Sequence, residues 1–153
     1  MPKYAYHGSL SVVVPVKNEQ DNVEPLVREI ANALSNAARF EIIYVNDGST
    51  DLTQQRLEAL RTEFPMLRII RHREACGQSR AVTTGVDAAK HEWIATLDGD
   101  GQNDPADIPA LLAQLSNASH PAHLELLAGW RAQRRDTFLR RLSSKVANGV
   151  RAS

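Results

Sequence analysis

Acidic side chains alternate along the chain directly after an apolar run. The run from Trp93 to Leu97 is followed by Asp98, Asp100, Gln102 and Asp104, with small or polar residues between them. This pattern is typical of a buried strand that opens into an acidic loop. Carboxylates so close together repel one another, and burying them without partners is costly, so a hard cation or a phosphate–cation pair is the natural occupant. We therefore predict that this loop holds a divalent metal ion and the diphosphate of a sugar nucleotide.

Other polar residues could complete such a site. Asp100 and Gln102 lie two apart in an extended loop, so both can point to one side and ligate a single Mg²⁺ or Mn²⁺ through oxygen. Asp47 can accept a hydrogen bond from a base N–H or a ribose hydroxyl, and Arg80 could bring positive charge to the phosphates. Simpler roles are also open: Asp47 with Gly48 is a common turn pair, Asp98 could cap the next turn, and arginines are frequent on helix surfaces.

The spacing of residues in the chain argues against several other functions for the acidic loop. A calcium-binding EF-hand would need Gly where Asn103 stands and Glu where Pro109 stands. No Gly-x-Gly-x-x-Gly or Gly-Lys-Ser/Thr motif follows an expected strand, which argues against a dinucleotide fold and a P-loop. A phosphotransferase or phosphatase that forms an aspartyl-phosphate on Asp98 also places Asp-x-Asp after an apolar strand. That alternative stays open on spacing alone.

The hydrophobic pattern predicts strands that alternate with helices. Pro15 is expected to close the first strand, and Ser49 or Thr50 to cap the second helix. Strands are predicted at 9–14, 40–45, 67–70, 92–97 and 124–128, and helices at about 21–34, 51–62, 81–89 and 105–115. Such alternation indicates an α/β fold, a Rossmann-like three-layer α/β/α arrangement with a mostly parallel central sheet. The polar clusters at 15–19, 46–51, 72–80 and 98–104 should then meet in one cleft at the carboxyl edge.

Composition limits the class of protein. With 153 residues, 42% of them hydrophobic, the chain can form one folded domain with a real core. Its 18 basic and 18 acidic residues cancel, so net charge gives no argument for nucleic acid as a partner. The single cysteine, Cys76, excludes an intrachain disulfide. The apolar stretch Leu10 to Val16 is too short to cross a bilayer, so we expect a cytoplasmic protein.

Positive charge is concentrated in the last part of the chain. Residues 131–151 hold seven Arg or Lys and one Asp, and Leu139, Leu142, Val146 and Val150 fall on one helical face. A basic amphipathic helix suits an anionic membrane surface or a lipid phosphate, although a solvated surface helix has the same pattern. We therefore divide the chain into a nucleotide-sugar-binding domain, 1–130, and a basic amphipathic segment, 131–153. The candidate membrane or acceptor contacts are Arg131, Arg140, Arg141 and Lys145.

Motifs in a fixed order carry a resemblance to a known family. They are Pro15-Val16-Lys17-Asn18-Glu19, Val45-Asn46-Asp47-Gly48-Ser49, Gly77-Gln78-Ser79-Arg80-Ala81 and Asp98-Gly99-Asp100-Gly101-Gln102. In this order and spacing the chain resembles the family-2 inverting glycosyltransferases of the GT-A fold. The likeness is greatest to the branch of dolichyl-phosphate mannose synthases and polyprenyl-phosphate glycosyltransferases. It covers nearly the whole chain and is specific to the superfamily rather than to one donor sugar.

The resemblance implies roles for individual residues. The nucleotide-sugar contacts would be Pro15, Lys17, Glu19, Asp47, Gln78, Arg80 and Asp98; the metal ligands would be Asp98, Asp100 and Gln102, with Asp98 and Asp100 as catalytic residues. There are departures from the branch. Lys17 stands where Tyr is frequent, and Asn46 replaces a frequent first Asp, so the base contacts can differ. Gln102 favours the glycosyltransferase over the phosphotransferase, which usually has Thr or Val there.

The resemblance also implies an activity and its partners. A sugar would pass from a nucleotide-diphosphate donor to an acceptor, with inversion and with Mg²⁺ or Mn²⁺ as cofactor. The expected acceptor is a polyprenyl (dolichyl or undecaprenyl) phosphate, which places the protein at the cytoplasmic face of a membrane. Because the family's catalytic domain continues past the length of this chain, we expect a C-terminally truncated protein. A remnant that binds nucleotide sugars without turnover is the alternative outside the enzymes.

Overall fold

The structure, a computed structural model, describes residues 8–36 and 39–115 and contains one parallel sheet. Its strands are β1 (Ser9–Val16), β2 (Arg39–Asp47), β3 (Leu67–His72) and β4 (Ile94–Thr96). They lie in the order β3-β2-β1-β4, and every neighbouring pair is parallel. This confirms the predicted parallel sheet. The predicted strand 124–128 and the basic segment 131–153 lie outside the described residues.

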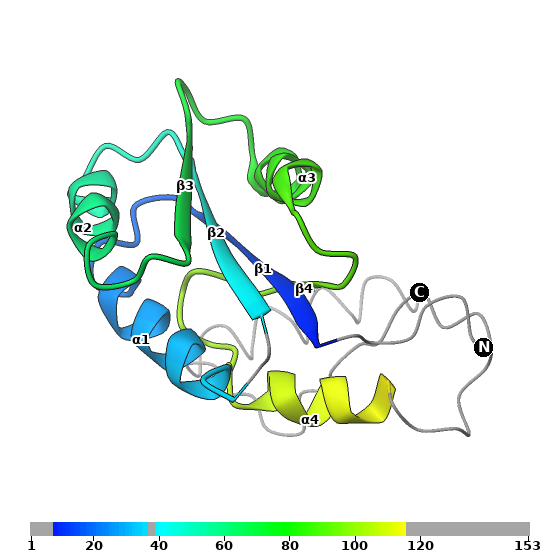
Figure 1. The fold of residues 1–153 in the computed structure, drawn as a ribbon. Coiled ribbons are helices and arrows are strands. Elements are labelled where there is room, and N and C mark those ends of the chain that lie inside the picture. Colours follow the sequence, from blue (N-terminus) through cyan, green and yellow to red (C-terminus); the bar gives the residue numbers. More distant parts are fainter. Residues whose placement is uncertain (1–7, 37–38, 116–153) are drawn as a thin grey trace, which may run out of the picture.

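Helices cover both faces of the sheet, which confirms the three-layer α/β/α arrangement (Figure 1). The helices are α1 (Val23–Ala33), α2 (Thr53–Leu60), α3 (Gln78–Ala88) and α4 (Asp107–Leu115). The larger core joins one sheet face to α1, α2 and α4, and the smaller core joins the other face to α3. In Figure 1, α3 accordingly lies alone on its side of the sheet. No helix in the described ranges is long and apolar enough to cross a membrane.

The apolar runs of β1 and β2 are buried on both faces because side chains alternate along each strand. Val12 and Val14 pack in the larger core, whereas Val13 faces α3 together with Val45. On α3 the small residue Gly85 permits a close approach. A Cβ built there would lie 2.3 Å from Val13 Cγ1 and 3.2 Å from Val45 Cγ2. Gly85 therefore lets α3 pack closely against β1 and β2.

The expectation that Pro15 closes the first strand is wrong. β1 continues through Pro15 and Val16, which pair with Val45 and Asn46 of β2. The reason lies on the other side of β1, where Ser11 and Val13 bond to the β4 segment and the ladder ends at the bond from Leu97 N–H to Val13 O, 3.1 Å. Pro15 would bond on that same side, two residues further on, beyond the end of the ladder. Its missing N–H therefore costs no sheet hydrogen bond.

The expected caps of the second helix are also wrong. α2 begins at Thr53, and the residue that bonds its first turn is Asp51, whose Oδ1 accepts the Thr53 N–H at 2.9 Å. Ser49 instead accepts the Asn18 N–H on its hydroxyl at 2.9 Å. The Ser49 hydroxyl, predicted to cap the start of this helix, thus joins two loops.

A buried carboxylate ties together the amino-terminal edge of the sheet. Glu41 of β2 is 6% exposed and accepts from the Ser11 hydroxyl and the Lys90 N–H, both at 2.7 Å. Arg68 of β3 donates to Glu41 at 2.6 Å and to the Ala88 carbonyl of α3 at 2.9 Å. Burial alone would raise the pKa of Glu41, but the hydrogen bonds and the Arg68 charge outweigh it and lower this pKa. The network attaches the end of α3 to the sheet.

Candidate functional site

A pocket of about 330 Å³ lies at the carboxyl edge of the sheet. At this edge β1 has β2 on one side and β4 on the other, so the order of the strands along the chain reverses there. Ligands of open α/β sheets bind at such a reversal. The lining comes from the ends of β1 and β2, the start of α3 and the loop after β4: Pro15, Val16, Lys17, Glu19, Asp47, Gly77, Gln78, Ala81, Asp98, Gly99 and Asp100. The predicted meeting of the polar clusters in one cleft is confirmed.

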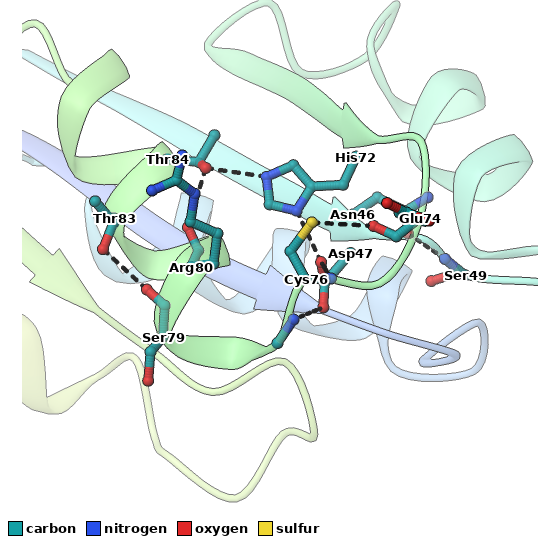
Figure 2. Close-up of polar contacts among 11 residues, drawn as sticks. Asn46, Asp47, Ser49, His72, Glu74, Cys76, Ser79, Arg80, Thr83 and Thr84 are labelled. Atoms are coloured by element: carbon teal, nitrogen blue, oxygen red, sulfur yellow. Dashed lines mark hydrogen bonds and ion pairs between the residues drawn. The ribbon is translucent and has the colours of Figure 1, made fainter.

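Asp47 is the last residue of β2 and lines the pocket, and Figure 2 shows it beside His72 and Cys76. Its Oδ1 accepts from the Cys76 N–H and from His72 Nδ1, both at 2.7 Å, and its Oδ2 accepts from the Gly77 N–H at 2.8 Å. Burial alone would raise the pKa of Asp47, and these three donors outweigh burial and lower this pKa. Asp47 therefore stays ionised, and it fixes the segment that leads into α3.

His72 was not predicted as a site residue; the sequence placed it in a polar loop. It is the last residue of β3, and its side chain is 13% exposed. Its Nδ1 contacts Asp47, and its Nε2 lies 2.9 Å from the Thr84 hydroxyl, which also lies 3.0 Å from the Arg80 carbonyl (Figure 2). His72 thus connects Asp47 to α3. No pattern in the sequence predicts this contact, because it depends on the register of β3 against β2 and on the position of α3 relative to the sheet.

Asp47, His72 and Cys76 also resemble a metal-binding cluster, since their ligand atoms lie within 4.8 Å of one another. Hydrogen bonding explains the arrangement better. The nearest ring nitrogen of His72 is already engaged by Asp47, and both Asp47 oxygens accept N–H groups. A metal ion would have to displace these donors from a buried carboxylate. We assign these residues to a hydrogen-bond network.

The acidic loop after β4 supplies the opposite wall of the pocket. Asp98 Oδ1 accepts from Gln78 Nε2 at 2.9 Å, which links the loop to the first residue of α3. Asp100 Oδ1 accepts the Gln102 N–H at 3.0 Å, so Asp100 rather than Asp98 holds the local turn. Asp104 does not line the pocket; its Oδ1 accepts the Ala106 N–H at 2.9 Å just before α4. The acidic residues thus divide into a pocket pair and a helix-start residue.

Two of the expected site residues stand outside the pocket lining. Arg80 is exposed on α3, and Gln102 is exposed in the loop after β4. Lys17 and Glu19 do line the pocket, as expected.

Hydrogen bonds between two loops hold Lys17 and Glu19 in place. The Glu19 N–H donates to the Thr53 hydroxyl at 3.0 Å, and the Asn18 Oδ1 accepts the Thr50 N–H at 2.8 Å. Asn18 has a φ of 55°, a conformation that Asn adopts more readily than most residues. The sequence did not identify Asn18 or Thr53 as site residues: Asn18 belongs to the polar cluster 15–19, whereas Thr53 lies beyond the cluster 46–51, at the start of α2.

Relatives of known activity share much of this sequence. The chain is 44% identical over 142 residues to the dodecaprenyl-phosphate galacturonate synthase of Rhizobium johnstonii, covering 91% of this chain and 41% of that protein. It is 34% identical over 151 residues to the undecaprenyl-phosphate 4-deoxy-4-formamido-L-arabinose transferase of Pseudomonas fluorescens, covering 97% of this chain and 42% of that protein. The chain therefore spans about two fifths of the length of these relatives.

Solved glycosyltransferases share the fold. A mannosyltransferase from Pyrobaculum calidifontis, solved with GDP-mannose and Mn²⁺, superposes with a TM-score of 0.63 at 23% identity, covering 78% of this chain and 34% of that one. Glucosyl-3-phosphoglycerate synthase from Mycobacterium tuberculosis, solved with UDP, superposes with a TM-score of 0.59 at 25% identity, covering 73% and 42%. The fold is therefore that of the GT-A glycosyltransferases.

The family model for glycosyl transferase family 2 matches residues 11–124, which include the described helices and strands, apart from the first two residues of β1, and the whole pocket lining. By this match and by its identity to the relatives above, the chain belongs to glycosyl transferase family 2.

Proposed function

We propose that the pocket binds a nucleotide-diphosphate sugar and that this chain supplies the donor-binding part of an inverting glycosyltransferase. The observation that carries this proposal is the composition of the pocket. Glu19, Asp47, Asp98 and Asp100 come from three separate segments of the chain, yet all line one cavity at the reversal point of the sheet, beside the start of α3. Family membership supports the same conclusion.

The pocket has two walls of different character, which suggests how the donor would lie. Pro15, Lys17, Glu19 and Asp47 belong to the β1 and β2 side and would contact the nucleoside. Gln78 starts α3 and touches Asp98 on the opposite side. The amino-terminal end of a helix carries partial positive charge and exposes N–H groups, so the diphosphate would lie between α3 and the acidic loop.

The acidic loop is suited to hold a divalent cation beside that diphosphate. Asp98 and Asp100 line the same pocket, and each uses Oδ1 in a hydrogen bond. Within residues 8–36 and 39–115, the Oδ2 atoms of these two carboxylates accept no hydrogen bond, so each has an oxygen available for Mg²⁺ or Mn²⁺. Gln102 is the third expected ligand. The cation would offset the negative charge of the departing nucleoside diphosphate.

The acceptor we propose is a polyprenyl phosphate, the class named in the relatives. A phosphate monoester has a second pKa of about 6, so it is already anionic near neutral pH and needs no base to attack the anomeric carbon. Asp98 and Asp100 would then serve to hold the donor rather than to remove a proton. The cytoplasmic membrane face, contacted through Arg131, Arg140, Arg141 and Lys145, is the proposed place of reaction, with 131–153 as a separate basic segment.

A phosphotransferase that uses Asp98 as its nucleophile has less support. Family 2 membership favours glycosyl transfer, and Gln78 already occupies one oxygen of Asp98. Incubation with a phosphate donor followed by mass spectrometry would detect an aspartyl-phosphate on Asp98. Its appearance would contradict our proposal.

A non-catalytic binding role predicts nucleotide binding without donor hydrolysis or transfer.

Calorimetric titration of the 153-residue chain with UDP-, GDP- and dTDP-linked sugars, with and without Mn²⁺, tests the proposal. We expect one base to bind, with higher affinity when Mn²⁺ is present. Asp100→Asn should remove the effect of Mn²⁺. Asp104→Asn is the matched control, because Asp104 belongs to the same loop but lies outside the pocket lining. If none of the sugar nucleotides binds, the proposal is wrong.

A further inference from the structure

We propose that His72 is a positioning residue for the nucleotide: it holds the Asp47 carboxylate in the one orientation that presents its Oδ2 to the pocket. This inference rests on the proposed function, because it concerns how the same pocket is prepared for its ligand. His72 itself is absent from the pocket lining, whereas Asp47 is part of it. The action of His72 on the ligand would therefore be indirect.

The orientation of Asp47 is set by three donors from two directions. The N–H groups of Cys76 and Gly77 approach from the segment that leads into α3, one to each carboxylate oxygen. The His72 ring approaches Oδ1 from the end of β3 at 2.7 Å. Oδ1 thus holds two donors and Oδ2 holds one. Because a carboxylate oxygen can accept about two hydrogen bonds, the remaining capacity of Asp47 is on Oδ2.

The proton on Nδ1 of His72 follows from its partner Asp47. An ionised carboxylate only accepts, so Nδ1 of His72 must carry a proton and donate it to Asp47. At the other end of the ring, Nε2 is held 2.9 Å from the Thr84 hydroxyl of α3. The ring is therefore held at both nitrogens, by Asp47 at the end of β2 and by Thr84 of α3 (Figure 2). Because Thr84 holds one side of the ring, the other side can keep the Asp47 carboxylate in one position.

Loss of the His72 donor should disturb the pocket in a specific way. Asp47 is 4% exposed, so water cannot easily replace the missing donor. The carboxylate can then turn about its last torsion, and the N–H groups of Cys76 and Gly77 lose their common acceptor. Gly77 and Gln78 line the pocket, so the change reaches both the nucleoside wall and the start of α3. We expect weaker nucleotide binding without loss of the fold.

Substitutions that keep one ring nitrogen at a time test this role. In His72→Asn the amide nitrogen takes the place of Nδ1 and keeps the donor to Asp47. In His72→Gln the amide nitrogen takes the place of Nε2 and keeps only the contact to Thr84. His72→Leu removes both. The dissociation constant is measured by calorimetry for each variant, using UDP, GDP and dTDP with excess Mn²⁺, and the unfolding midpoint is measured alongside.

We expect the Asn variant to bind the preferred nucleotide within about threefold of the unsubstituted protein. The Gln and Leu variants should bind about tenfold or more weakly, the effect of one hydrogen bond to a charged group. If the Leu variant does not fold, the comparison of Asn with Gln still decides, since a merely structural role of the ring would not separate them. Equal affinity in the Asn and Gln variants overturns the inference and leaves the proposed function standing. Absence of nucleotide binding by the unsubstituted protein overturns both.

Discussion

Strand β2 carries a buried carboxylate near each end, and the two are held by the same kinds of group. Glu41 is 6% exposed and Asp47 is 4% exposed. Each receives a hydrogen bond from a cationic or titratable side chain of β3, Arg68 or His72. Each also accepts backbone N–H groups from a segment adjoining α3: Lys90 after the helix, and Cys76 and Gly77 before it. The two carboxylates thus attach the two ends of α3 to the sheet.

The Glu41 and Asp47 carboxylates differ in their surroundings. Ser11, Lys90 and Arg68 surround Glu41 with donors from within the fold at the amino-terminal edge. Asp47 stands at the carboxyl edge, where it lines the pocket. The same construction serves stability at one edge, and at the other edge we propose that it serves ligand binding as well. Placement at the carboxyl edge of a parallel sheet, rather than the hydrogen-bond pattern, separates the two roles.

The largest expected effect is on stability, from Glu41→Ala. The substitution leaves the Arg68 guanidinium, the Ser11 hydroxyl and the Lys90 N–H without their common acceptor. We expect a loss of about 3 kcal/mol in the free energy of unfolding, the low end for a broken buried pair, because Arg68 is partly exposed. Urea unfolding measures this loss. Nucleotide affinity of the folded fraction should not change, and a drop of more than about threefold would show that the two edges are coupled.

Asp47→Asn should give the converse result. The Asn amide would place its NH₂ group against at least one of the donors from His72, Cys76 and Gly77, and the substitution removes the negative charge. We expect nucleotide affinity to fall about 30-fold, equivalent to about 2 kcal/mol, with a smaller change in the unfolding midpoint. Calorimetry with the preferred nucleotide gives the number. Glu41→Gln, the same acid-to-amide change on the same strand, is the matched control and should bind normally. Similar losses in both variants would contradict the division of roles.

Gly85→Ala tests the helix that joins the two networks. The added methyl would meet Val13 Cγ1 at 2.3 Å, so α3 must move away from the sheet. Overpacking of this kind costs about 1–3 kcal/mol, from which the better helix propensity of Ala recovers up to about 1 kcal/mol. We expect a net loss of about 1 kcal/mol by thermal unfolding and a severalfold weaker affinity. Thr83→Ala, an exposed change on the same helix, serves as the control.

The pH dependence of stability should show the smallest and most gradual effect. Both Glu41 and Asp47 have a pKa lowered by folding, so each contributes stability that is complete above the usual carboxyl pKa, about 4. This contribution is lost as the pH falls through the folded-state value. Glu41→Gln and Asp47→Asn should each flatten the acid limb of the stability curve. Denaturant unfolding at several pH values below neutrality measures the slope, and an unchanged slope in both variants would contradict the lowered pKa values.

The fold could be predicted because its signals are local. Runs such as Val12 to Val14 and Ile42 to Val45 mark buried strands, and the spacing of Leu26, Val27 and Ile30 marks an amphipathic helix. The pocket residues Glu19, Asp47, Asp98 and Asp100 could be named because each lies at or just after the end of a strand. Their convergence then follows from parallel strand direction alone.

The remaining features depend on partners distant in sequence. The bond between His72 and Asp47 joins residues 25 positions apart, and the bond between Asn18 and Ser49 joins residues 31 apart. Neither follows from periodicity or turn chemistry, because both need the register of one segment against another. The early stop predicted at Pro15 failed for a related reason: whether a proline interrupts a sheet depends on what lies beside it.

Pro15 has a further consequence for the shape of the site. β1 pairs with β2 as far as Val16, whereas its ladder with β4 ends at the bond from Leu97 to Val13. With no N–H at Pro15, a longer β4 would find no donor there, and the chain leaves the sheet at Asp98. Gly99 then passes so close that a Cβ on it would lie 2.9 Å from the Pro15 carbonyl oxygen. The missing N–H of Pro15 thus marks the point where β1 and β4 separate, and Pro15, Asp98 and Gly99 line the pocket there.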